Sequence, residues 1–227
     1  MSNYLDRIAA KLGPQIAPGA NIHETCRIEM GAEISAQAVL ASGVHIGRFV
    51  KLAGQVTICP SVTVHPYTTL VGPLFIGEGS IIGPGVIIGL NQADTESRHT
   101  RLMDACRIGR AAQILAGLQV GPQARIRAFS VVTGDVPPYA IAASNPAHLE
   151  GYACLLCGGL LSQVQENEDV VEACCTTCGA EGYRFPQRAW TAAFNRVLLP
   201  HHRFGAPGTL LHTPRGWRDQ DEIEVGE

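Results

Sequence analysis

The sequence predicts an all-β fold in which a parallel β-helix with triangular coils is followed by a small metal-binding segment. Three observations lead to this prediction. An aliphatic residue recurs at every sixth position over much of the chain, 25 glycines and 14 prolines occur among 227 residues, and most cysteines lie in one short stretch. That glycine and proline content is atypical of a helical bundle, and a hydrophobic share of 46% is atypical of a disordered chain.

The six-residue period runs without a break from Ile16 to Ile88 and returns from Ile108 to Val132. It fits neither the 3.6-residue period of a helix nor the two-residue alternation of a single strand. It suits a coil of three short strands joined by tight turns, with the aliphatic side chains stacked inside. We therefore expect a β-helix over residues 15–150. The first run consists of Ile16, Ile22, Ile28, Ile34, Leu40, Ile46, Leu52, Ile58, Val64, Leu70, Ile76, Ile82 and Ile88.

An inserted loop is expected at residues 89–107, where the period is interrupted by GLNQADTESRHTRLMDACR. This stretch is rich in polar and charged side chains. Loops on rigid scaffolds commonly hold functional groups, so we expect substrate binding or catalysis here. The alternative is a solvated loop that packs against a neighbouring subunit.

Four cysteines after the β-helix form two CxxCG units, Cys154–Cys157 and Cys175–Cys178, separated by seventeen residues. Each unit directs two thiolates to one point, and two units complete a closed tetrahedral zinc site. In a chain with no secretion signal, such a cluster favours a metal over disulfides. We expect structural zinc in a zinc-ribbon-like segment over residues 151–183, against the alternative of a reduced or redox-active cluster.

The two ends of the chain carry weaker signals. Residues 1–14 are expected to form an amphipathic helix that caps the first coil. Residues 184–227 form a C-terminal extension, in which residues 184–199 have the apolar spacing of a helix. The formal net charge of −3 and the absence of a long apolar run argue against nucleic-acid and membrane partners. We expect a cytoplasmic protein.

The segments IIGPGVIIGLNQ, CRIGRAAQILAGLQVG and DVPPYAIAASNPAHLEG give the chain a family resemblance. The repeat resembles that of hexapeptide-repeat proteins, whose fold is a left-handed parallel β-helix. The order of the segments is similar to that of bacterial nucleotide-sugar N-acetyltransferases, which acetylate the amine of a nucleotide-linked amino sugar. The resemblance implies a homotrimer with acetyl-CoA between neighbouring prisms, and the implied cofactor-binding residues are Ala116, Gly117, Ser130 and Asn145.

The resemblance also implies where the chemistry occurs. An asparagine shortly before the loop holds the amine in that family. Alignment places this asparagine at Leu90, one residue before Asn91. Imidazole is suited to proton transfer near neutral pH, so His99 in the loop is the candidate base. We therefore expect Asn91 and His99 to be catalytic, although a loop histidine can equally serve a hydrogen-bonding role.

The chain departs from the family pattern at the end of the repeat. Arg127 and Phe129 stand where the family has glycines beside the CoA arm, and Ser144 replaces the glycine of the family's GNPA segment. Two alternatives follow: an acyltransferase of a specialised metabolite with another donor, and a non-catalytic trimeric scaffold. A γ-type carbonic anhydrase is disfavoured, because His23, His45 and His65 do not share a position within the coil.

Overall fold

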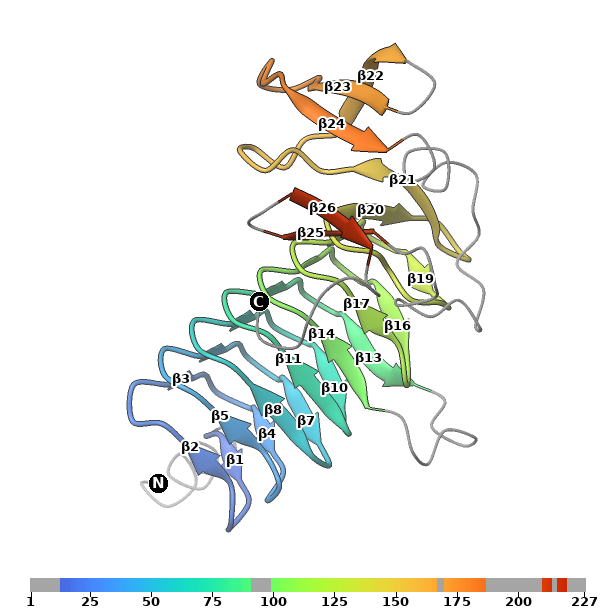
Figure 1. Ribbon diagram of the computed structural model, residues 1–227. Coiled ribbons are helices and arrows are strands. Elements are labelled where there is room, and N and C mark those ends of the chain that lie inside the picture. The colour runs from blue at the N-terminus through green and yellow to red at the C-terminus, as the bar shows by residue number, and fades with distance from the viewer. Residues whose placement is uncertain (1–12, 91–98, 167–169, 187–209, 214–215, 220–227) are drawn as a thin grey trace, which may run out of the picture.

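Three parallel sheets form the faces of a prism in the computed structural model (Figure 1), and β-strands of two to four residues build most of it. The structure describes residues 13–90, 99–166, 170–186, 210–213 and 216–219. We call the faces A, B and C in the order in which the chain visits them. The turns between them are the AB, BC and CA corners.

The strands of each face follow one another along the prism axis. Face A contains β1 (Gln15–Ile16), β4 (Glu33–Ile34), β7 (Lys51–Ala53), β10 (Thr69–Val71), β13 (Ile87–Leu90), β16 (Gln113–Leu115) and β19 (Val131–Val132). Face B contains β2 (Asn21–Ile22), β5 (Val39–Leu40), β8 (Val56–Ile58), β11 (Leu74–Ile76), β14 (Thr100–Leu102) and β17 (Gln119–Val120). Face C contains β3 (Arg27–Ile28), β6 (His45–Ile46), β9 (Thr63–Val64), β12 (Ile81–Ile82), β15 (Arg107–Ile108), β18 (Arg125–Ile126), β20 (Ala140–Ala143) and β21 (His148–Tyr152).

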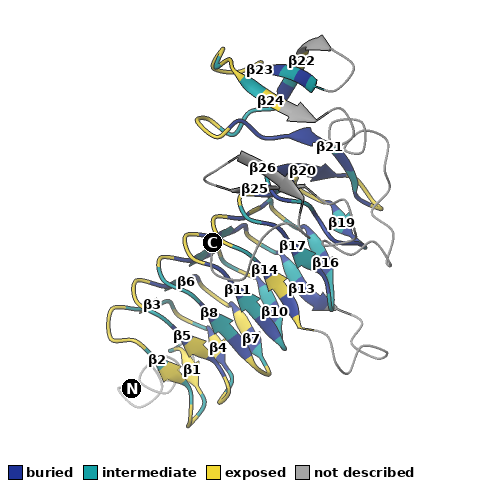
Figure 2. Ribbon diagram, viewed as in Figure 1, coloured by how far each residue is buried: buried dark blue, intermediate teal, exposed yellow. Residues whose placement is uncertain are grey.

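The predicted β-helix is confirmed, and its core is the predicted set of aliphatic residues. Ile16 pairs with Ile34 and Leu52 with Leu70, so equivalent residues of successive coils lie side by side. From the second coil onward these aliphatic side chains are buried, with Ile46, Leu70 and Ile88 fully inaccessible (Figure 2). Small residues at the corners fill the space between them. Ile16 is 46% exposed, because among the described residues the first coil has a neighbouring coil on one side only.

The interruption of the repeat is shorter than the expected loop at 89–107. Strand β14 pairs with both β11 and β17, and Leu102 is fully buried between Ile76 and Val120. The β-helix therefore resumes at Thr100 and not at Ile108, because Leu102 already occupies an inward position six residues earlier. Residues 91–98 lie outside the described part of the chain.

A further sheet, separate from the three faces, follows the prism. Antiparallel β21 closes face C, and β22 (Leu161–Glu166), β23 (Val170–Cys175) and β24 (Tyr183–Pro186) form a three-stranded antiparallel sheet beyond it. Buried Tyr152 and Leu161 join this sheet to the core of the prism. A hairpin of β25 (Leu210–Thr213) and β26 (Gly216–Asp219) completes the described strands.

Within the described ranges the structure contains strands and turns and no helix, and hence no helix able to cross a membrane. The expected capping helix falls almost entirely on residues 1–12, which are not described. The helix expected over 184–199 is wrong at its start, because residues 184–186 pair with β23 as part of β24. Its remaining residues lie outside the described part.

Candidate functional site

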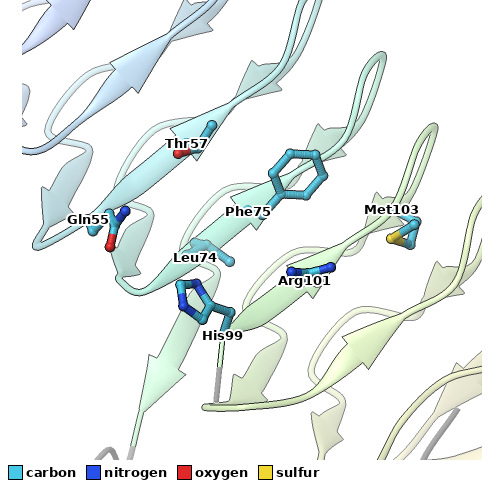
Figure 3. Close-up of a pocket in the computed structure, with 7 residues that line it drawn as sticks. All are labelled: Gln55, Thr57, Leu74, Phe75, His99, Arg101 and Met103. Atoms are coloured by element: carbon cyan, nitrogen blue, oxygen red, sulfur yellow. The ribbon is translucent and has the colours of Figure 1, made fainter. Parts of the chain in front are cut away.

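A pocket of about 310 Å³ lies on the outside of face B, beside the point where the repeat is interrupted. Figure 3 shows its side chains projecting from three successive coils. The outward residues of β8, β11 and β14 form its floor, and residues of the adjoining corners form its rim. It is lined by Gln55, Thr57, Leu74, Phe75, His99, Arg101 and Met103.

His99 stands at the rim of this pocket because the residue after it is fixed to two coils. The Thr100 N–H donates to the Pro73 carbonyl at 3.0 Å, and the Thr100 hydroxyl accepts from the Gly117 N–H at 2.9 Å. Thr100 is 1% exposed, whereas the imidazole of His99 lies in an exposed position. The backbone at the end of the interruption is thus fixed, while the ring of His99 is exposed and lines the pocket.

The described lining of the pocket carries a positive charge. Arg101 lies beside Phe75 in the register of β11 and β14, and the described lining residues include no carboxylate. A guanidinium presents a fork of donors to a carboxylate or phosphate, and an aromatic face receives an apolar or planar group. The arrangement can therefore hold an anionic ligand next to the imidazole of His99.

The remaining predicted site residues fall on two different corners. Ala116 and Gly117 lie at the AB corner one coil beyond His99, and Gly117 is joined to it through the hydrogen bond to Thr100. Ser130 lies at the CA corner, on the other side of face A, and Asn145 lies in the turn between β20 and β21 that stacks next to this corner. Asn91, the predicted partner of the amine, is outside the described residues.

Ser130 is fully buried inside the prism, and its hydroxyl has no hydrogen-bond partner among the described residues. Its side chain therefore faces the core, away from any ligand in a surface groove. Asn145, by contrast, is exposed. Of these two residues, only Asn145 offers its side chain to a ligand.

Two of the three departures from the family pattern, Phe129 and Ser144, have backbone conformations that favour glycine. Phe129 has φ +63° and Ser144 has φ +85°. Both turns thus have a backbone conformation typical of glycine although the residue carries a side chain. The side chain of Phe129 is 66% exposed. A bulky ring projects at the place where the family leaves clearance.

The four predicted metal ligands come together at the end of the prism. The sulfur atoms of Cys154, Cys157, Cys175 and Cys178 all lie within 4.8 Å of one another. Cys157 and Cys175 are 3.4 Å apart, and Cys154 and Cys178 are 3.7 Å apart. Zinc with Zn–S bonds of about 2.3 Å in a tetrahedron places its sulfurs about 3.8 Å apart. These separations fit a metal ion and exceed the roughly 2 Å of a disulfide.

The two CxxCG turns have the same backbone construction. Gly158 and Gly179, with φ +72° and +70°, donate to the carbonyls of Cys154 and Cys175. Beyond these turns, the Gly159 N–H points to the Cys157 sulfur at 3.3 Å. Such N–H groups stabilise thiolates, as a metal site requires.

Two side chains from outside the turns complete the surroundings of the cluster. The Tyr183 hydroxyl lies 3.1 Å from the Cys154 sulfur. Burial opposes ionisation of this thiol, but the Tyr183 hydroxyl and nearby backbone N–H groups outweigh it and lower the pKa of Cys154 to about 6. Arg125 of β18 reaches from the prism to Gly158, where its guanidinium fills the space that a Cβ atom would occupy. A cation next to four thiolates offsets their negative charge.

The residues on the floor of the pocket were not predicted from the sequence. Thr57, Phe75 and Arg101 are outward residues of consecutive face B strands. The spacing of Thr57 and Phe75, one full coil, is visible in the sequence once the coil length is known. Arg101 is hidden because the interruption shifts the count between β11 and β14.

No protein-family model matches the chain. It is 30% identical over 151 residues to the bifunctional protein GlmU of Xanthomonas campestris, covering 61% of this chain and 33% of GlmU. It is 33% identical over 112 residues to the serine acetyltransferase of Haemophilus influenzae, covering 43% of this chain and 42% of that enzyme. The chain thus spans about a third to two fifths of the length of these relatives.

Solved structures with a similar backbone fold include the D94A mutant of AntD, an N-acyltransferase from Bacillus cereus in complex with dTDP and coenzyme A. That comparison covers 68% of this chain and 90% of AntD, with 15% identity and a TM-score of 0.48. A Bacillus cereus protein described as a putative acetyltransferase shows 19% identity over 63% of this chain and 79% of its own, with a TM-score of 0.49.

The six-residue period, the three-faced parallel β-helix and the sequence similarity to a serine acetyltransferase agree with one another. The chain thus has the three-faced parallel β-helix that its six-residue repeat predicts, and its repeat region is similar in sequence to part of a serine acetyltransferase.

Proposed function

We propose that the protein is an acyl-CoA-dependent N-acyltransferase that acts on the amine of a small anionic acceptor, most simply a nucleotide-linked amino sugar. The observation that carries the proposal is the pocket of His99 and Arg101 beside the interruption of the repeat. The similarity of the repeat region to a serine acetyltransferase supports acyl transfer. The resemblance of the exit segment to nucleotide-sugar N-acetyltransferases supports an amine acceptor, with acetyl-CoA as donor.

In the proposed reaction the amine nitrogen attacks the carbonyl carbon of the thioester. The new C–N bond forms as the C–S bond breaks, and coenzyme A leaves as its thiol. The imidazole of His99 accepts the proton that the amine loses, and Arg101 holds the anionic part of the acceptor. Asn91 is proposed to orient the amine.

We further propose a homotrimer with acetyl-CoA in the groove between subunits. The two corners that carry the implied cofactor-binding residues are separated by face A within one chain, which supports a site shared between subunits. The four cysteines are proposed to hold zinc. Closed four-sulfur coordination would leave no open position, so this zinc would stabilise the fold and take no part in the reaction.

The proposal is tested by incubating the zinc-loaded protein with acetyl-CoA and a panel of UDP- and TDP-linked amino sugars and detecting acylated product by mass spectrometry. Loss of a general base typically costs about 10²- to 10⁴-fold in rate, so His99→Ala should reduce turnover by that order. Arg101→Gln should raise KM for the anionic acceptor more than it lowers kcat.

His23→Ala is the matched control, because His23 is an exposed histidine that directly follows β2, two strands along face B from β8, and it does not line the pocket. It should leave the rate unchanged. Failure of every acceptor and donor, or a His99→Ala variant as active as the wild type, would contradict the proposal.

A further inference from the structure

Equivalent residues of successive turns form a column along the CA corner. Some of them are aromatic, and an open slot lies where two small residues follow one another. The third residue of successive CA turns forms this column, and backbone hydrogen bonds hold each turn on the next. The Tyr67 N–H donates to the Arg48 carbonyl at 2.9 Å, and the Gly85 N–H donates to the Pro66 carbonyl at 3.0 Å. The column consists of Gly31, Phe49, Tyr67, Gly85, Ala111 and Phe129.

Phe49 and Tyr67 form the first half of the column. Their rings stack with centroids 5.6 Å apart and an interplanar angle of 10°, and the ring of Phe49 covers Gly31. Tyr67 is 66% exposed. Since one face of the Tyr67 ring contacts Phe49, its other face is directed towards the next coil, which carries Gly85.

The next two positions leave this face of Tyr67 uncovered. A Cβ atom added at Gly85 would have no atom within 4 Å, and Ala111 contributes only a methyl group. Coils of a parallel β-helix are about 4.8 Å apart, close to the separation of stacked planar groups. A planar ring placed over Gly85 would therefore continue the stack in the position of the missing side chain.

The far side of the slot carries a positive charge. The guanidinium of Arg110 lies over the ring of Phe129, 5.8 Å from its centroid. Among the described residues, no carboxylate forms an ion pair with Arg110, whereas Arg127 pairs with Glu150 at 2.7 Å. Arg110 is thus free to bind an anionic group that enters the slot.

We propose that this slot binds a nucleotide, with its base stacked on Tyr67 above Gly85 and a phosphate bound by Arg110. An aromatic face and a guanidinium on the two sides of an open space can bind a base and a phosphate. The nucleotide would be the adenosine phosphate of an acyl-CoA or the nucleoside diphosphate of the acceptor. The choice between these two nucleotides rests on the proposed function. The proposal that the slot binds a nucleotide does not.

The test is a calorimetric titration of the zinc-loaded full-length protein with adenosine 3′,5′-bisphosphate and, separately, with UDP. At least one should bind. Gly85→Tyr supplies the missing ring from the chain itself and should weaken binding about tenfold or more. Tyr67 and Phe129 adopt the same left-handed conformation, so a tyrosine is compatible with this turn.

Gly79→Tyr is the matched control. Gly79 has φ +65°, close to the +68° of Gly85, and a Cβ atom there also meets nothing within 4 Å, but it lies at the BC corner. Its binding should equal that of the wild type, whereas Tyr67→Ala and Arg110→Met should both bind more weakly. Preference for the bisphosphate assigns the slot to the donor, and preference for UDP assigns it to the acceptor.

Absence of binding by both nucleotides would overturn the proposal, as would equal binding by the wild type and Gly85→Tyr. A change in oligomeric state on Gly85→Tyr without any nucleotide binding would instead make the column a contact between copies of the chain and would likewise overturn it. The titration needs no turnover. A failure of acyl transfer is therefore distinguishable from a failure of this site.

Discussion

Removing the hydroxyl of Ser130 should stabilise the β-helix. Ser130 occupies the fourth position of a CA turn, where its side chain points into the prism and its hydroxyl has no hydrogen-bond partner among the described residues. Ala112 occupies the corresponding position of the neighbouring coil and is fully buried, so alanine fits there. Thr68 occupies the same position on another coil, and its hydroxyl donates to the Gly83 carbonyl at 2.9 Å.

Removal of the hydroxyl should change the free energy of unfolding in opposite directions at Ser130 and at Thr68. A buried hydroxyl without a partner costs about 1 to 3 kcal/mol, and the small void left by its removal offsets part of the gain. We expect Ser130→Ala to raise the free energy of unfolding by about 1 kcal/mol. Thr68→Val removes a satisfied hydrogen bond and leaves a carbonyl unpaired, so it should lower the free energy of unfolding by about 1 to 3 kcal/mol.

The assay is urea unfolding followed by circular dichroism, with zinc kept saturating so that the four-cysteine segment contributes equally. Acetyl-CoA binding is measured on the same two variants. Because the Ser130 side chain faces the core, Ser130→Ala should leave this binding unchanged. A marked loss of stability in Ser130→Ala, or weaker acetyl-CoA binding, would refute the reasoning.

Further predictions concern the cysteines and the prism end. Removal of zinc with a chelator should unfold the four-cysteine segment while the β-helix remains, which amide hydrogen exchange resolves by region; unchanged protection would contradict a structural metal. Gly158→Ala should weaken zinc binding more than Gly179→Ala. Both glycines have left-handed φ values, but only a Cβ atom at Gly158 overlaps Arg125. An equal loss of zinc affinity in the two variants, measured by competition titration, would argue against a role of the Arg125 contact. Burial raises the pKa of Cys106 to about 12, so native protein at pH 8 should resist alkylation there while the partly exposed Cys174 reacts; mass spectrometry checks this, and early labelling of Cys106 would contradict its burial. In the unfolded chain this thiol ionises above pH 9, so its contribution to stability should fall as pH rises from about 9 towards 12, a trend that pH-dependent urea midpoints report.

The solenoid could be predicted because its determinant is local and periodic. Each inward aliphatic, such as Ile46 or Ile82, repeats the same place in the coil, so spacing alone identifies the core. Leu102 was not predicted because its distance from Ile88 is not a multiple of six. It lies six residues before Ile108, in step with the resumed repeat, and its pairing with Ile76 shows that it belongs to the β-helix.

The candidate site was only partly predictable. His99 and the four cysteines stand out as residue types at informative places. Outward positions carry no periodic constraint, so Phe75 could not be related to Arg101 until the length of the interruption was known. The burial of Ser130 follows from its place in the turn, which the sequence comparison with the family does not reveal.

The central claim is that this β-helix binds an acyl-CoA donor. It is tested most directly by calorimetric titration of acetyl-CoA into the zinc-loaded protein, with Phe129→Gly in parallel because the ring of Phe129 stands where the family leaves clearance. The account predicts saturable, micromolar binding by the wild type. No binding by either protein would contradict acyl-CoA-dependent transfer, and binding by Phe129→Gly alone would mean that the native ring closes the groove to this donor.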